Sequence, residues 1–248
     1  ILDRNNNILA TDSAVYKLIL DPRHIDTDLN KSSNKKRYQR FLLILNNLNI
    51  KNTESINKFN NYLNKLKNQN IKFKIFANDL SPKQMQNIKQ LNISGVSFEK
   101  NLKRYYPGGK RTSNLLGYTN HKNQGIEGVE LKYNNQLIGS KGEITSVKTR
   151  DGKIVQLKKN NQATHGKAIK LTIDKNIQYL TYKALEQTSI KYQAKSASAI
   201  ILNIKTGEIF AMANYPGFNP NNNSQKNINR KNNAISDLFE PGSTIKPL

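Results

Sequence analysis

Two residues near the end of the sequence, Ser243 and Lys246, have the types and the spacing of a nucleophile and a base. A serine hydroxyl is a weak nucleophile unless a neighbouring group takes its proton. Residues three positions apart on a helix are surface neighbours, so the lysine amine would lie beside the hydroxyl. The amine can act as a base only where burial or a nearby cation favours its neutral form.

The flanking residues indicate where the helix that carries this pair would begin. Pro247 directly follows Lys246, and proline is tolerated in a helix only in the first turn. We therefore expect the helix to begin near Gly242 or Ser243, after the tight turn that Pro241 favours. Ser243 would then have free N–H groups and the helix dipole beside it, which favour a developing alkoxide. The alternative is a serine that only caps a helix and a solvated lysine, which is the commoner origin of a bare Ser-x-x-Lys.

The wider stretch, residues 239–247, reads Phe-Glu-Pro-Gly-Ser-Thr-Ile-Lys-Pro. Ser-x-x-Lys is the nucleophile motif of class A β-lactamases and penicillin-binding proteins. The stretch closely resembles this motif in class B penicillin-binding proteins, most of all in the division-specific septal transpeptidase. The resemblance implies that Ser243 is the nucleophile, that Lys246 is its base or proton relay, and that the Ser243 N–H is an oxyanion-hole donor.

Composition excludes several other functions. The net charge of +23 could attract nucleic acid, an anionic membrane or an acidic polymer. No helix-turn-helix, zinc-finger or RNP-type pattern accompanies it, so no nucleic-acid partner is predicted. The chain has no cysteine and only three scattered histidines, so neither a metal site nor a cofactor is predicted. No stretch approaches about 18 consecutive apolar residues, so no membrane span is predicted.

Hydrophobic periodicity in the first hundred residues predicts a small sheet covered by helices. The predicted elements are a strand over 13–20, two amphipathic helices between 35 and 70, a half-buried strand over 71–76, and a helix that Ser81 caps, with Pro82 first, to about Leu91. Residues 3–10 resemble the D-R-x-G-x-x-L-A signature of class B penicillin-binding proteins. Asn6 stands where that signature has glycine, and asparagine is the next best residue at positive φ.

Further matches follow between residues 104 and 142. Arg104-Tyr105-Tyr106-Pro107 and Leu116-Gly117-Tyr118 are similar to the family's R-x-Y-P and L-G-Y/F motifs. A short helix is predicted from Glu127 to Gln136, ending at Gly139. Glu127 and Glu130 could be taken for a catalytic carboxylate pair, but no second acid–base environment accompanies them. We expect them to have a structural role.

The second half of the sequence alternates strands, turns and one long helix. The predicted elements are a hairpin over 142–157 with an Asp151-Gly152 turn, a strand over 168–173, a helix over 175–192 capped by Asp174, and strands over 197–203 and 208–213 joined by a turn at 205–207. Ile177, Leu180, Ala184 and Leu185 are expected on one side of that helix. This order resembles the start of a penicillin-binding transpeptidase domain.

The resemblance implies an α+β fold in two domains. Residues 1–165 would form the N-terminal pedestal or dimerisation-type module of class B penicillin-binding proteins. Residues 166–248 would form the truncated start of a transpeptidase domain of the serine β-lactamase-like class. The sequence departs from the family at Asn233, where R-N-R-A has its second arginine. A salt bridge of that arginine is therefore not expected here.

The implied function is a peptidoglycan D,D-transpeptidase that cross-links stem peptides through a serine acyl-enzyme in cell division and is the target of β-lactams. The alternatives are an elongation-type transpeptidase, a β-lactam sensor, and an inactive scaffold that binds divisome partners. The family's S-x-N and K-T-G motifs would follow Leu248. We therefore expect a piece of a longer protein that does not bind β-lactam covalently by itself.

The resemblance also implies a location and partners. The protein would lie in the cell envelope, on the periplasmic side of the cytoplasmic membrane, with a single anchor helix preceding Ile1. Its protein partners would be a polytopic glycosyltransferase and division proteins. We interpret the positive charge mainly as a solvated surface, with some attraction to anionic envelope polymers.

Overall fold

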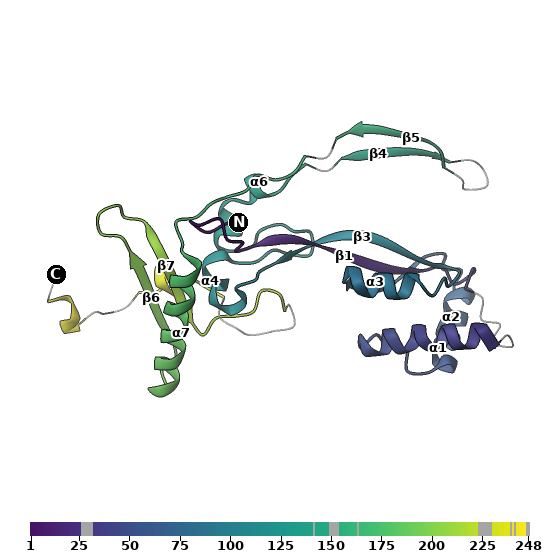
Figure 1. The fold of residues 1–248 in the computed structure, drawn as a ribbon, viewed down its shortest axis with the longest axis horizontal. Helices are drawn as coiled ribbons and strands as arrows, with labels where there is room; N and C mark the ends of the chain where they lie inside the picture. The colour runs from purple at the N-terminus through teal and green to yellow at the C-terminus, as the bar shows by residue number, and fades with distance from the viewer. Residues whose placement is uncertain are drawn as a thin grey trace. The chain divides into compact units, whose positions relative to one another are not determined.

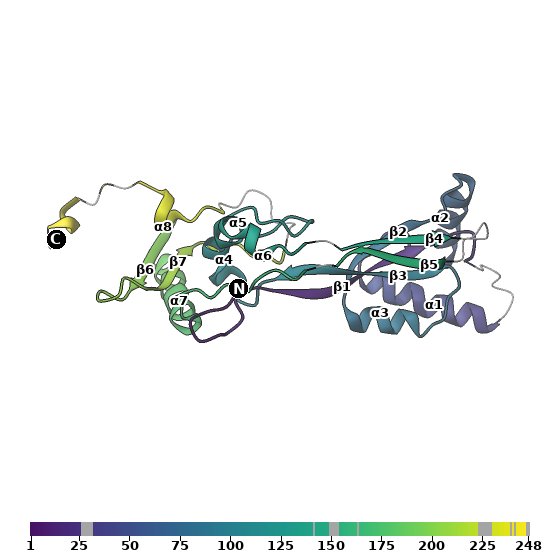
Figure 2. The same cartoon turned by 90° about the horizontal axis from the view of Figure 1, so that it is seen from above.

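A computed structural model describes residues 1–25, 32–140, 142–148, 154–162, 164–222, 230–238, 240 and 242–246 (Figures 1 and 2). It combines helices and strands, as the predicted α+β class requires. The chain forms two compact units: unit 1 comprises Ile1–Thr11 and Arg104–Leu248, and unit 2 comprises Asp12–Lys103. These units divide the chain at other positions than residue 165, and the domain boundary stays a prediction.

Unit 2 is built on a three-stranded sheet in the order β2-β1-β3, with β1 and β2 antiparallel. Its elements are β1 (Thr11–Leu20), α1 (Ser32–Asn47), α2 (Ile56–Asn68), β2 (Lys74–Leu80), α3 (Pro82–Lys89) and β3 (Val96–Tyr105). The predicted first strand and both amphipathic helices are confirmed.

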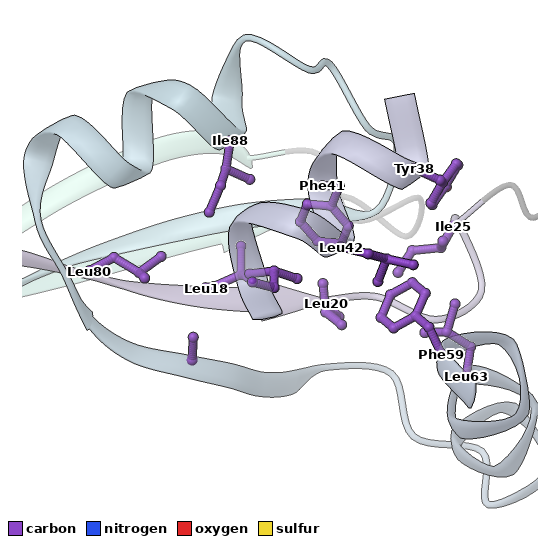
Figure 3. Packing of buried hydrophobic residues seen from close by; sticks show 12 residues of the cluster. Leu18, Leu20, Ile25, Tyr38, Phe41, Leu42, Phe59, Leu63, Leu80 and Ile88 are labelled. Carbon is purple, nitrogen blue, oxygen red and sulfur yellow. The ribbon is translucent and has the colours of Figure 1, made fainter. Parts of the chain in front are cut away.

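The core of unit 2 joins these helices to β1 (Figure 3). Leu18 and Leu20 of β1 are fully buried, and the helices contribute buried side chains at helical spacing, among them Phe41, Leu45, Phe59, Leu63 and Ile88. The rings of Phe41 and Phe59 meet edge to face with centroids 5.9 Å apart. This burial explains why the spacing of apolar residues predicted both helices correctly.

The start of α3 is fixed by the residues that predicted it. Ser81 accepts a hydrogen bond from the Gln84 N–H at 3.2 Å, and the Gln84 side chain accepts one from the Ser81 N–H at 2.7 Å. Pro82 occupies the first turn, where no N–H is needed. This reciprocal cap satisfies two donors that the helix itself leaves unpaired.

The predicted strand over 71–76 is wrong in two respects: the strand lies later in the chain, at Lys74–Leu80, and different side chains are buried. Ile71 still closes the end of α2 by donating to the Leu66 carbonyl, so pairing with β1 starts only at Lys74. Phe73 and Ile75 are exposed, and Ala77 and Leu80 are buried instead. The register shifts beside Leu18 change which β2 side chains face the core, because one extra residue reverses the alternation.

Unit 1 contains the remaining elements. They are the short helices η1 (Gly109–Arg111), α4 (Ser113–Leu116), α5 (Gly128–Lys132), α6 (Asn134–Leu137), α8 (Asn233–Ser236) and η2 (Gly242–Ile245), the long helix α7 (Lys175–Lys191), and the strands β4 (Glu143–Lys148), β5 (Ile154–Asn161), β6 (Ala197–Leu202) and β7 (Ile209–Tyr215). The strands pair as two antiparallel hairpins, β4-β5 and β6-β7. Both hairpins were predicted; the Asp151-Gly152 turn lies outside the described residues.

Two predicted elements of unit 1 need correction. The single helix over 127–136 is instead α5 and α6, which are separated at Tyr133. Residues 168–173 do not form a named strand. They run extended beside the N-terminal segment, where the Leu2 N–H donates to the Ile169 carbonyl at 2.8 Å and the Leu171 N–H donates to the Leu2 carbonyl at 2.9 Å. A single parallel bridge is too short to count as a strand.

Asp174 caps the start of α7, as predicted, because its carboxylate accepts from the N–H groups of Asn176 and Ile177. The apolar residues expected on one side of this helix are not its buried residues. Leu180 is 61% exposed, and the buried positions are the polar or aromatic Gln178, Thr181, Tyr182 and Ser189. Gln178 hydrogen-bonds from this face to β7, so apolar periodicity alone does not set how the helix packs.

Gly117 shows why the Leu-Gly-Tyr motif needs a glycine. Its φ of +76° lies in a region that side chains disfavour. A Cβ built there would meet the Glu127 carbonyl oxygen at 1.9 Å. Two backbone segments therefore cross at this point at a distance that no other residue permits.

Candidate active site

Ser243 and Lys246 lie in one short helical turn. Element η2 is a 3₁₀ turn that begins at Gly242, where φ is +55°. The Lys246 N–H closes the turn on the Ser243 carbonyl at 3.3 Å. Residues three apart eclipse each other in a 3₁₀ turn, so these two positions stand one above the other. The predicted start of a helical segment at Gly242 or Ser243 is confirmed.

Both side chains of the pair are exposed to solvent. A lysine amine loses its proton readily only when burial or a neighbouring cation disfavours the charged form. The described residues therefore place the two positions one turn apart along the backbone, without the environment that would activate the side chains. The roles of Ser243 and Lys246 stay predictions at this point.

The strand pair β6-β7 and helix α7 form the support from which the chain leads to η2. Gln178 of α7 is 1% exposed, and its amide binds the β7 backbone on both sides of Met212. The Met212 N–H donates to the Gln178 carbonyl oxygen at 2.8 Å, and the Gln178 amide nitrogen donates to the Met212 carbonyl at 3.0 Å. The same nitrogen donates to the Arg111 carbonyl at 2.7 Å. One buried amide thus joins α7, β7 and the last residue of η1.

Helix α8 lies next to β6 and β7 (Figure 2). The buried Asn214 of β7 binds the residues at the start of α8. Its side-chain oxygen accepts from the Ala234 N–H at 2.9 Å, and its amide nitrogen donates to the Asn232 side chain at 2.7 Å. Sequence reasoning did not single out Asn214, because it is one of many asparagines and directly follows the predicted strand over 208–213.

Of the two carboxylates at 127 and 130, Glu130 is bound in a buried ion pair. Glu130 is buried and accepts a hydrogen bond from the Arg104 side chain, with 2.7 Å between Arg104 Nε and Glu130 Oε1. The two side chains are 11% and 3% exposed. The expected structural role of Glu130 is confirmed, and it ties the Arg-x-Tyr-Pro motif to α5.

The N-terminal turn is organised by a buried carboxylate. Asp3 is fully buried and accepts from the N–H groups of Asn5 at 2.8 Å and Asn7 at 2.7 Å, from the Asn7 side chain at 2.9 Å, and from the Lys175 N–H at 3.1 Å. Asn6 has a φ of +65°, which confirms the prediction that asparagine replaces glycine here. Burial raises the pKa of Asp3, but the hydrogen bonds from Asn7, Lys175 and Asn5 together hold it below its usual value.

The lowered pKa of Asp3 predicts a pH dependence of stability. The unfolded carboxyl titrates near pH 4, and the folded one titrates lower. The contribution of the Asp3 carboxylate to the free energy of unfolding is therefore complete above about pH 4, and it is lost as pH falls through the pKa of the folded state. We expect Asp3→Asn to lower the free energy of unfolding by about 1–3 kcal/mol at pH 7, because buried N–H donors lose their acceptors. The deficit should shrink in acid.

Urea unfolding of both proteins at pH 7 and pH 3 checks this expectation. Asp79→Asn is the matched control, because Asp79 is exposed and pairs with Lys103 at the surface. An Asp3→Asn deficit that is as large at pH 3 as at pH 7 would contradict the assigned titration.

None of the helices in the described parts of the chain combines the length and apolarity that crossing a bilayer requires. The described residues also contain no group of three or more His, Cys, Asp or Glu side chains that could hold a metal ion.

Comparisons with known proteins match the whole chain to one family. The profile of the penicillin-binding protein dimerisation domain matches residues 1–171, and that of the penicillin-binding protein transpeptidase domain matches residues 197–248. The peptidoglycan D,D-transpeptidases FtsI of Buchnera aphidicola (subsp. Schizaphis graminum) and Escherichia coli K12 are 36% and 34% identical over 100% of the chain. The chain spans 42% and 41% of these relatives, about two fifths of their length.

A solved structure shows a similar fold. Penicillin-binding protein 2X from Streptococcus thermophilus aligns with 92% of this chain and 36% of its own, with a TM-score of 0.60 and 24% sequence identity. At that identity the likeness concerns the fold alone. It agrees with the predicted succession of an N-terminal module and the start of a transpeptidase domain.

Proposed function

The chain belongs to the family of penicillin-binding proteins, and from this membership we propose that the full-length protein is a peptidoglycan D,D-transpeptidase with Ser243 as its nucleophile. The observation that carries the proposal is the Ser-x-x-Lys pair at the closed 3₁₀ turn, inside the range matched by the transpeptidase profile. Similarity over the whole chain to two proteins named peptidoglycan D,D-transpeptidase supports it.

The chemistry assigned to the pair is acyl transfer. Ser243 Oγ forms a bond to the carbonyl carbon of the penultimate D-Ala of a stem peptide, and the bond from that carbon to the terminal D-Ala nitrogen breaks. The hydroxyl proton passes through the Lys246 amine to the leaving nitrogen. The Ser243 N–H, in the first turn of η2, stabilises the negative charge on the carbonyl oxygen. An amine of a second stem peptide then takes the acyl group and frees the serine.

A β-lactam would react with the same serine, because its strained amide presents an equivalent carbonyl carbon. The exposure of Ser243 and Lys246 implies that residues beyond those described complete the activating environment in the full-length protein. We further propose a role in septal wall synthesis, an extracytoplasmic location with an N-terminal membrane anchor, and association with a polytopic glycosyltransferase and division proteins. The names of the FtsI relatives support the septal role.

The test is covalent labelling of the full-length protein with a fluorescent penicillin. We expect one label per molecule on the peptide that contains Ser243, no label on Ser243→Ala, and release of D-Ala from a stem pentapeptide by the unmodified protein only. The chain 1–248 alone is expected to take no label. A folded full-length protein that is labelled at another residue, or not at all, would contradict the proposal.

A further inference from the structure

Two buried asparagines hold the segment that precedes the candidate nucleophile. Asn114 on α4 is 7% exposed and Asn214 on β7 is 3% exposed. Both direct their amides at residues 230–234, just before and within the start of α8. We refer to Asn114 and Asn214 as the asparagine clamp. Asn114 lies in the range matched by the dimerisation profile and Asn214 in the range matched by the transpeptidase profile.

Each amide of the clamp makes more than one bond to this segment. The Asn114 amide nitrogen donates to the Lys231 carbonyl at 2.8 Å and to the Arg230 carbonyl at 3.4 Å. Asn214 binds the Ala234 N–H and the Asn232 side chain, at the distances given above. The clamp therefore hydrogen-bonds to both the backbone and a side chain of residues 230–234, with one asparagine on α4 and the other on β7.

The segment is held by hydrogen bonds and by stacking of Arg230, whose guanidinium lies 4.6 Å from the centroid of the Tyr118 ring and 5.7 Å from that of the Phe218 ring. Within α8, Ile235 is 70% exposed, and Leu238 just beyond it is fully exposed. The apolar side chains that follow are exposed, so the hydrogen bonds to the two buried amides, together with the stacking of Arg230, fix where the backbone runs. Such bonds are costly to break, because the buried partner is left unsatisfied.

We propose that Asn114 and Asn214 are positioning residues for the reaction at Ser243. By fixing residues 230–234, they set the point from which the chain runs nine residues from Ala234 to the nucleophile. This inference rests on the proposed function of Ser243. A displacement of about 1 Å at the reacting hydroxyl can lower a rate by roughly 10²-fold. Loss of the clamp should therefore lower the acylation rate constant, with smaller effects on the free energy of unfolding and on the dissociation constant of the initial β-lactam complex.

Ser198 provides a matched control within the same network. Its hydroxyl donates to the side-chain oxygen of Asn214 at 2.8 Å, but it belongs to β6 and not to the segment before Ser243. Ser198→Ala removes a hydrogen bond from the same buried amide and leaves its contacts to Asn232 and Ala234 in place. A purely structural role of Asn214 would make this variant resemble the clamp variants.

The experiment measures fluorescent penicillin labelling of the full-length protein over a range of concentrations, which separates the dissociation constant of the initial complex from the acylation rate constant. We expect Asn214→Leu, Asn114→Ala and Asn232→Ala to lower the acylation rate constant by roughly 10–100-fold. The dissociation constant should stay unchanged. Ser198→Ala should keep the wild-type acylation rate constant. The double variant Asn214→Leu with Asn232→Ala should acylate no more slowly than Asn214→Leu alone, because each substitution removes the same hydrogen bond between Asn214 and Asn232.

The outcomes separate this inference from the proposed function. Wild-type protein without label on Ser243 overturns the proposed function and, with it, this inference. Wild-type protein labelled on Ser243, with clamp variants that acylate at the wild-type rate, overturns only the inference. An equal loss in Ser198→Ala would also overturn it, because the effect would then be general destabilisation. If Asn214→Leu does not fold, the half-buried Asn232 provides the same comparison through Asn232→Ala.

Discussion

In the full-length protein, Lys246→Ala is expected to lower the rate at which Ser243 is acylated by a labelled penicillin by roughly 10²–10⁴-fold, the range typical of a lost general base. The serine would keep its place in η2, but its proton would have no acceptor one turn away. Time courses of labelling, with quantification of the Ser243 peptide, provide the measurement.

Lys246→Arg distinguishes proton transfer from simple charge. Arginine keeps its positive charge but does not give up its proton near neutral pH. We therefore expect Lys246→Arg to be as slow as Lys246→Ala. Lys205→Ala, at the exposed turn between β6 and β7, is the control and should acylate normally. Acylation of Lys246→Arg at the wild-type rate would show that the charge of residue 246, and not its basicity, is what the reaction uses.

The largest effect on stability is expected from breaking the ion pair between Arg104 and Glu130. Both side chains are nearly inaccessible, so removing the carboxylate leaves a buried guanidinium without that partner. We expect Glu130→Ala to lower the free energy of unfolding by about 3–5 kcal/mol. Replacing both residues, as in Arg104→Met with Glu130→Leu, should recover much of this loss, because neither charge is then buried.

Equilibrium unfolding in urea of the full-length protein provides the measurement. The control is Glu54→Ala, which breaks the exposed pair with Lys58 and should cost less than about 1 kcal/mol. A Glu130→Ala loss no greater than that of the control would mean that the buried pair contributes no more than a surface one.

Local signals predicted the elements whose boundaries are set locally. The cap of α3 is encoded by Ser81, Pro82 and Gln84, which are adjacent in sequence, so the helix start could be predicted. The faces of β2 and α7 could not be predicted in the same way. A register shift beside Leu18 and the buried amide of Gln178 decide them, and both depend on contacts with distant segments.

The same distinction between local signals and long-range contacts applies to the candidate site. Ser243 and Lys246 are recognisable because their spacing and flanking residues form a short motif. Asn114 and Asn214 are not, because their partners lie about 117 and 20 residues away, respectively, and asparagine is abundant throughout the chain. Only the structure separates these two buried amides from the many asparagines at the surface.

The discontinuity of unit 1 has a consequence for the order in which the chain folds during synthesis. Unit 2 is one uninterrupted stretch, so it can fold as soon as its own residues are available. Residues 1–11 must wait for partners such as Ile169 and Lys175, which are made about 170 residues later. At bacterial elongation rates this delay is on the order of 10–30 s. Residues 1–11 are therefore sheltered late although they precede unit 2 in the chain, and unit 2 is expected to fold before unit 1 is complete.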